Sequence, residues 1–168
     1  MRLTITALLC LIIFSCSGSK SAATESKPSK KELKGTWQVT NIRFVGKEGL
    51  YKVNLFDLAD SPCFKNSEWV FIPNNGTGKF NLNTSNNCTA STNRILWSFY
   101  DAGGAQYYFQ FKFVNEKNKP LSVTKSGYRM RISNLTPSTM ETRVKTSSQG
   151  HPFDIVLTFD KISDTITL

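Results

Sequence analysis

The side chains that most often perform catalysis are few and scattered in this sequence. His151 is the single histidine, and it lies beside Pro152 in a segment typical of a turn. A metal site or a histidine-activated nucleophile needs partners at suitable spacing, and the sequence has no histidine pair and no cysteine pair at ligand spacing. The carboxylates are equally dispersed, at Glu68, Asp101, Glu116, Glu141, Asp154 and Asp160. We therefore expect no enzyme activity, no metal and no cofactor.

Large aromatic side chains are the chemical feature that recurs along the chain, which has 12 Phe, 5 Tyr and 3 Trp. Several alternate with polar residues, and this pattern places them on one face of extended segments. Such rings either line a cavity for a small apolar or amphiphilic ligand or simply fill a core, and the sequence leaves both interpretations open. The candidate ligand-binding residues are Trp69, Phe71, Trp97, Phe99, Tyr107, Phe109, Phe111 and Tyr128.

Three arginines form a second candidate site. Arg129, Arg131 and Arg143 alternate on two expected neighbouring strands, so they should share the face opposite the aromatic residues. This basic patch could contact phosphates, acidic sugars or another protein, or it could be an ordinary solvated surface.

The N-terminus carries a targeting pattern. Arg2 precedes an apolar run over residues 3–14, which is shorter than the roughly 20 residues of a membrane-spanning helix and therefore indicates a signal peptide. Residues 13–16 (IFSC) resemble the lipobox of bacterial lipoproteins, with an aliphatic residue three positions before an obligatory cysteine and a small residue just before it. The resemblance implies cleavage after residue 15 and acylation of Cys16, which would anchor the protein to a membrane.

Residues 1–15 are thus expected to be a lipoprotein signal peptide, and residues 16–34 a lipidated cysteine with a flexible tether rich in Ser, Ala and Lys. A lipoprotein signal implies the cell envelope. Ser17 after the cysteine favours the outer membrane, and the lack of an acidic run after Cys16 favours its periplasmic side. Once Arg2 is removed, 20 Lys and Arg remain against 12 Asp and Glu, a net charge of +8. Export argues against nucleic acid as the partner of this basic chain.

Export also determines which cysteines remain to form a disulfide. Cys10 is lost with the signal and Cys16 is the anchor, so Cys63 and Cys88 are the expected disulfide pair of an oxidising compartment. Closing that loop would contribute about 3.5 kcal/mol in the chain-entropy model. The alternative is a pair of unpaired buried thiols.

From Gly35 onward, alternation with period two predicts eight strands. The first strand slips near Asn41, which indicates a bulge. Residues 50–64 are ambiguous, with a short helical face that ends at Pro62. The expected strands are residues 36–45, 67–72, 79–83, 94–100, 106–114, 127–135, 139–146 and 153–161.

Eight strands joined by short hairpins can close into an antiparallel up-and-down barrel, which removes exposed sheet edges. We therefore expect an all-β barrel over residues 35–168, with a two-sheet sandwich as the alternative. A barrel of this size is either filled by side chains or holds one small ligand.

The start of the first strand carries a family resemblance. Gly35-Thr36-Trp37, after one helical turn at residues 31–34, is similar to the Gly-x-Trp motif of the lipocalins. The resemblance implies that Gly35 permits a tight turn into the strand and that Trp37 closes the base of an eight-stranded barrel. Lys161 is the cation nearest to the place where that family stacks an arginine on the tryptophan. Over residues 33–168 the chain resembles the lipocalin-like lipoproteins of Bacteroidota-type bacteria.

These patterns predict a membrane-anchored, non-catalytic envelope lipoprotein whose lipocalin-like barrel binds a small apolar or amphiphilic ligand. The alternative is an interaction or inhibitor lipoprotein that docks on another envelope protein through the barrel exterior, using Arg129, Arg131 and Arg143.

Overall fold

The computed structural model describes residues 27–46, 53–85, 87–148 and 150–166. All eight strands expected from the sequence are present within this part of the chain, and the remaining elements fall between residues 53 and 64. The elements are β1 (Gly35–Val45), β2 (Asn54–Leu55), β3 (Ala59–Asp60), the 3₁₀ turn η1 (Ser61–Phe64), β4 (Glu68–Ile72), β5 (Thr77–Leu82), β6 (Ser91–Asp101), β7 (Tyr107–Phe113), β8 (Tyr128–Leu135), β9 (Thr139–Ser148) and β10 (His151–Ser163).

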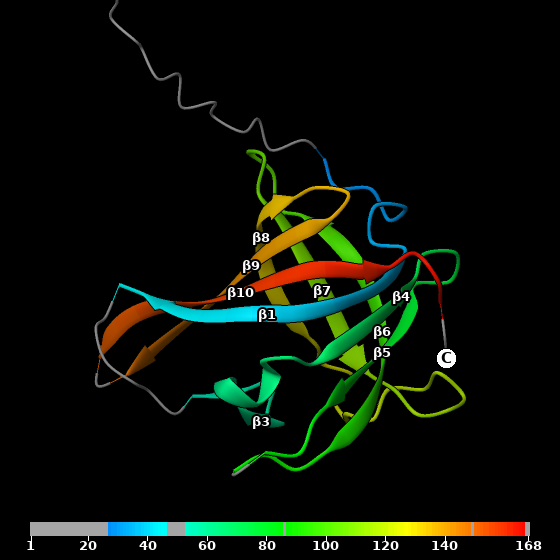
Figure 1. The fold of residues 1–168 in the computed structure, drawn as a ribbon. Helices are drawn as coiled ribbons and strands as arrows, with labels where there is room; N and C mark the ends of the chain where they lie inside the picture. The colour runs from blue at the N-terminus through cyan, green and yellow to red at the C-terminus, as the bar shows by residue number, and fades with distance from the viewer. Residues whose placement is uncertain (1–26, 47–52, 86, 149, 167–168) are drawn as a thin grey trace, which may run out of the picture.

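Eight of these strands form a closed barrel in the order β1-β10-β9-β8-β7-β6-β5-β4 (Figure 1). Every pair is antiparallel, and β1 closes the barrel because it pairs with β10 on one side and with β4 on the other. Trp37 thereby lies opposite both Lys161 and Trp69 in the register. The expected up-and-down barrel is confirmed, and the two-sheet sandwich is wrong.

Short polar turns produce the meander. Between β4 and β5, the side chain of Asn75 accepts a hydrogen bond from the Thr77 amide at 3.0 Å, and Gly76 adopts a φ of 64° that favours glycine. Between β6 and β7, Asp101 accepts from the Gly103 amide at 2.9 Å in the same way. These side chains satisfy backbone donors at the turns, so consecutive strands pair with each other.

The predicted bulge in β1 is confirmed. The register of β1 against β10 shifts between Val39 and Asn41. Beyond the shift, Ile42 and Phe44 pack against the hydrophobic core. The extra residue therefore restores the inward face that strict alternation would have lost.

Residues 53–64 differ from the expected short helix that ends at Pro62. They form the small β2–β3 hairpin and then the turn η1, in which Pro62 lies at the beginning rather than the end. A fixed φ and a missing amide donor suit proline to the first turn of a helical segment, which explains its position.

The packed domain begins earlier than Gly35. Leu33, assigned to the tether by the sequence, is fully buried in the core. Gly35 then turns the chain into β1 with a φ of 115°, and a Cβ at this position would lie 2.3 Å from the Ser163 carbonyl oxygen. Glycine is the residue that permits both this conformation and this close approach.

Candidate functional site

The eight candidate ligand-binding aromatics meet in one core inside the barrel. Five are buried, at Trp69, Phe71, Trp97, Phe109 and Phe111. The other three, Phe99, Tyr107 and Tyr128, are partly buried and pack against them.

Ring contacts connect this core across the barrel. Phe109 contacts Phe71 from the opposite wall at a centroid distance of 5.4 Å, and it stacks on Trp97 at 5.8 Å. Trp69 stacks on Phe80 of the neighbouring strand at 4.1 Å. The rings therefore occupy the middle of the barrel as a packed cluster.

Two more rings come from the β1–β4 connection. Phe56, in the turn of the β2–β3 hairpin, is 6 % exposed, and Phe64 of η1 is fully buried. Phe56 lies against Phe111 at 4.9 Å and against Tyr128 at 5.5 Å, measured between ring centroids. The sequence analysis missed both residues, because their segment has no regular period. We call residues 53–64 the cap.

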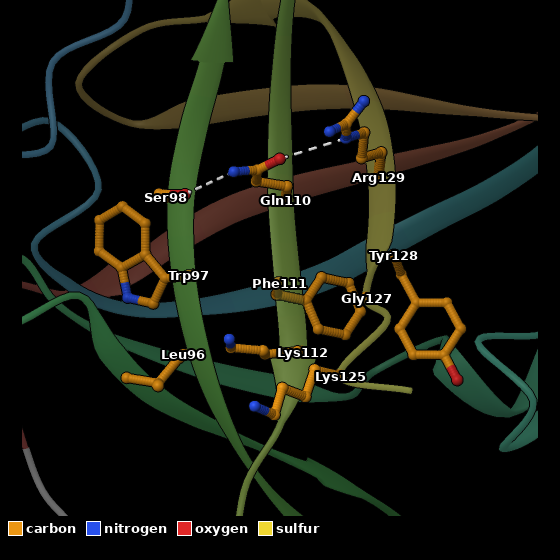
Figure 2. Close-up of a pocket in the computed structure, with 10 residues that line it drawn as sticks. All are labelled: Leu96, Trp97, Ser98, Gln110, Phe111, Lys112, Lys125, Gly127, Tyr128 and Arg129. Carbon is orange, nitrogen blue, oxygen red and sulfur yellow. Dashed lines mark hydrogen bonds between the residues drawn. The ribbon is translucent and has the colours of Figure 1, made fainter. Parts of the chain in front are cut away.

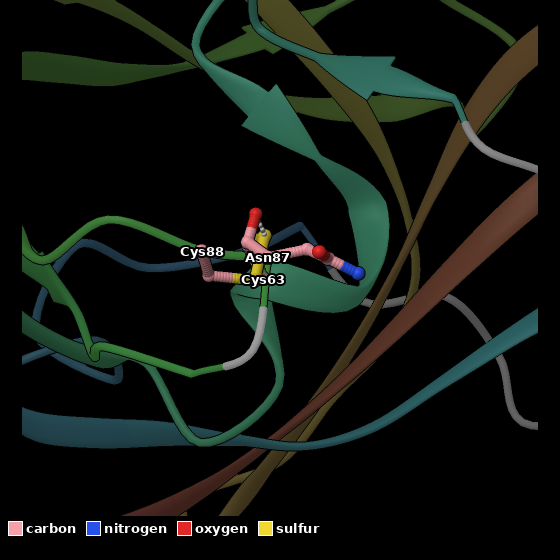
Figure 3. Close-up of a disulfide and its surroundings, with 3 residues drawn as sticks. All are labelled: Cys63, Asn87 and Cys88. Carbon is pink, nitrogen blue, oxygen red and sulfur yellow. Dashed lines mark hydrogen bonds between the residues drawn. A yellow bond between two sulfur atoms is a disulfide. The ribbon is translucent and has the colours of Figure 1, made fainter.

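Two contacts attach the cap to the barrel. The Tyr128 hydroxyl donates a hydrogen bond to the Asp57 carboxylate at 3.1 Å. Desolvation, this hydrogen bond and the charge of Asp57 all raise the pKa of Tyr128 above its ordinary value. At the other end of the cap, Cys63 forms the predicted disulfide with Cys88, which follows β5 (Figure 3).

The turn of the cap is strained. Phe56 and Asp57 have φ values of 58° and 50°. A bulky residue such as Phe56 loses roughly 1–2 kcal/mol in this left-handed region, which Asp tolerates better. Burial of the Phe56 ring and the Tyr128 hydrogen bond hold the turn in that conformation.

Trp37 lies at the other end of the barrel, near the start of β1. Its indole nitrogen donates to the Leu33 carbonyl at 3.0 Å, and the whole side chain is buried. The Lys161 ammonium lies 5.1 Å from the ring centroid. This geometry allows a cation–π contact at the base of the barrel.

The three arginines of the expected basic patch have different surroundings. Arg131 and Arg143 lie opposite each other in β8 and β9. Arg143 is within 3.4 Å of Glu141 and 3.6 Å of Asp154, so its charge is offset. Arg129 instead donates to Gln110 at 3.1 Å and lies 4.1 Å from the centroid of the Tyr100 ring.

Glu141 is the carboxylate at the centre of the charged cluster on β9. Burial favours its neutral form, but hydrogen bonds from Ser133 and Arg43 and the charges of Arg43 and Arg143 outweigh burial and lower the pKa of Glu141. This outer face is therefore a network of ion pairs.

A hollow of about 550 Å³ lies on the exterior, over β6, β7 and the beginning of β8 (Figure 2). The side chains of Leu96, Ser98, Gln110 and Lys112 alternate with the inward aromatics of the same strands and face it. Alternation in the sequence predicts that these side chains point outward. It does not predict that they border a hollow.

His151 is exposed at the start of β10. Within the described ranges, no three His, Cys, Asp or Glu side chains gather as metal ligands, and no helix is long and apolar enough to span a membrane. Cys16 lies outside the described residues.

Comparison with solved structures gives distant matches. Bovine odorant-binding protein in complex with a selenium-containing odorant has a TM-score of 0.42 and 15 % identity, over 82 % of this chain and 74 % of that chain. The same bovine protein with its natural ligand has a TM-score of 0.41 and 16 % identity, over 82 % and 76 % of the two chains. No curated protein sequence matches significantly.

The family comparison is more decisive. The model of the lipocalin-like domain matches residues 33–142, which is more than half of the chain. The match begins at the buried Leu33 and includes Gly35, Trp37, the cap and the strands β1 to β8. Together with the closed eight-stranded barrel, this match shows that the chain belongs to the lipocalin-like domain family.

Proposed function

We propose that this protein is a non-catalytic binding protein that holds a small apolar or amphiphilic molecule inside the barrel, behind the cap. The observation that carries the proposal is the position of Phe56. Its ring packs on Phe111 and Tyr128, but it belongs to a turn outside the barrel strands. A ligand can therefore take its place without disturbing the sheet.

The energetics of the cap agree with such an exchange. Withdrawing Phe56 exposes a ring whose burial contributes about 1.5–3 kcal/mol, and it breaks a hydrogen bond that contributes about 0.5–1.5 kcal/mol. Relief of the left-handed Phe56 returns roughly 1–2 kcal/mol. Opening thus costs on the order of a few kcal/mol at most, which an apolar ligand offsets when it buries a similar area.

The space behind the cap suits an aromatic or aliphatic ligand. Phe111 and Tyr128 would border it, and the Tyr128 hydroxyl, freed from Asp57, would offer one polar contact. Apolar cavities of about 150 Å³ lined by such side chains bind small aromatic molecules.

The proposal includes a membrane anchor. The lipobox-like residues 13–16 support acylation of Cys16, and the tether that follows would hold the barrel at the surface of the outer membrane, on its periplasmic side. Docking through Arg129, Arg131 and Arg143 has less support as a function, because Arg143 pairs with Glu141 and Asp154.

Titration with N-phenyl-1-naphthylamine, an apolar dye that fluoresces out of water, tests the binding function. The full-length chain in a mild detergent should show weak but saturable binding, with about one dye per barrel, because the dye must displace Phe56. Detergent alone and the chain unfolded in urea are the controls. A signal that fails to saturate, or that persists in urea, would contradict the proposal.

A further inference from the structure

The exterior hollow collects positive charge from three parts of the chain. Lys112 comes from β7, Lys125 from the β7–β8 connection and Arg129 from β8. Figure 2 shows the side chains of Lys112 and Lys125 pointing to the same side, toward β6. None of the ten residues that line the hollow is acidic.

These cations differ from those elsewhere on the barrel. Arg43, Arg143 and Lys161 each lie within ion-pair distance of a carboxylate. Lys112, Lys125 and Arg129 have no such partner within the described part of the chain. Like charges without a carboxylate partner that line one concave surface create a positive potential, which an anion relieves.

The arginine of the hollow contacts two neighbouring side chains, those of Gln110 and Tyr100. Ser98 accepts a hydrogen bond from the Gln110 amide at 2.9 Å, and the Gln110 oxygen accepts one from Arg129 Nε at 3.1 Å (Figure 2). The Tyr100 ring lies 4.1 Å from the guanidinium carbon. The two terminal nitrogens of Arg129 make no hydrogen bond to the described residues, and this pair of donors is the fork that binds an oxyanion.

Backbone packing brings the connection between β7 and β8 close to β7. A Cβ on Gly127 would lie 2.5 Å from the Phe111 carbonyl oxygen, so the absence of a side chain lets the connection approach β7 at that point. Lys125, two residues earlier, has a φ of 55° and donates its amide to the Ser122 carbonyl in a tight turn. The position of Lys125 over the hollow follows from these two constraints.

We infer that the hollow formed by Lys112, Lys125, Arg129 and Gln110 is a second binding site, on the outside of the barrel, for a small molecule that carries phosphate, sulfate or carboxylate groups. Its volume of about 550 Å³ is within the range of small-molecule sites. The site is separate from the barrel interior, because these side chains point away from the aromatic core.

A matched pair of double variants tests the inference. The full-length chain is titrated with a pyrene trisulfonate dye at about 0.15 M salt, where distant surface charges are screened. Lys112→Gln/Arg129→Gln removes two charges from the hollow. Arg131→Gln/Lys145→Gln removes two charges from the outer face of β8 and β9, so both variants have the same net charge. Circular dichroism checks that all three proteins are folded.

We expect saturable binding to the wild type, a loss of affinity of about tenfold in Lys112→Gln/Arg129→Gln and less than about twofold in the control pair. Displacement by pyrophosphate or by citrate then identifies phosphate or carboxylate as the preferred group. Equal losses in both variants would show general surface attraction and overturn the inference, as would the absence of saturable binding. Neither result would affect the apolar site, which is measured with a different dye.

Discussion

The ring of Phe56 lies 4.9 Å from the ring of Phe111, at an angle of 77° between their planes. Phe56 belongs to the cap, which the Tyr128–Asp57 hydrogen bond and the Cys63–Cys88 disulfide attach to the barrel. Phe111 belongs to β7, in the barrel wall. This edge-to-face contact gives the interior two kinds of aromatic packing. The strand rings are fixed by the sheet, whereas the rings of the cap are held by tertiary contacts to the barrel.

Phe109 should be essential for stability. Its side chain is fully buried between Phe71 and Trp97, so Phe109→Ala should lower the free energy of unfolding by about 3–5 kcal/mol in urea titrations. Phe99→Ala, which removes a partly buried ring that contacts Phe109, is the control and should cost clearly less. Equal losses would contradict a packed centre around Phe109.

Tyr128→Phe should loosen the cap, because it removes the hydroxyl that donates to Asp57. The pKa of Tyr128 is raised in the folded state, so its contribution is present below the unfolded pKa of about 10 and is lost as the pH rises through the folded value. In urea unfolding at pH 7, the free energy of unfolding of the wild type should exceed that of the variant by about 0.5–1 kcal/mol. This difference should disappear in strong alkali. Identical alkaline profiles would show that this bond does not stabilise the cap.

The contribution of Glu141 to stability should depend on pH in the opposite direction to that of Tyr128. Its folded pKa is lowered, so its contribution is present above the unfolded pKa of about 4.3 and is lost as the pH falls through the folded value. Glu141→Gln should cost about 1–2 kcal/mol at pH 7 and almost nothing near pH 2, measured by thermal or urea unfolding. Glu68→Gln, on an exposed side chain, should be close to neutral at both pH values. A cost for Glu141→Gln that persists in acid would point to packing instead of charge.

The barrel could be predicted from the sequence because its determinants are local. Alternation placed Trp97 and Phe109 inward, and Asn75 with Gly76 marked a hairpin turn. The slip at Asn41 showed in the same alternation. Eight such segments with short turns close into a barrel.

The cap could not be predicted in this way. Phe56 and Asp57 adopt left-handed conformations that the usual turn residues, Gly and Asn, would have signalled. Tyr128, which holds the turn, lies 71 residues away in the sequence. The exterior hollow was missed for a similar reason, since Lys125 comes from a connection whose approach to β7 depends on Gly127.

The proposed membrane anchor yields a direct labelling prediction. Cys16→Ala should abolish incorporation of radiolabelled palmitate and leave the chain uncleaved or soluble, because the acyl acceptor is lost. Cys10→Ala changes a cysteine within the expected signal and should leave labelling intact. Palmitate in the Cys16→Ala protein would contradict the anchor.

The most direct test of the binding function is the affinity of Phe56→Ala for N-phenyl-1-naphthylamine. The variant removes the ring that occupies the space behind the cap, so we expect the dye to bind at least about tenfold more tightly than to the wild type, because it no longer competes with Phe56. Leu121→Ala, which changes an exposed residue outside the cap, should leave the affinity within about twofold of the wild type. An unchanged or weaker affinity of Phe56→Ala would contradict a ligand site behind the cap.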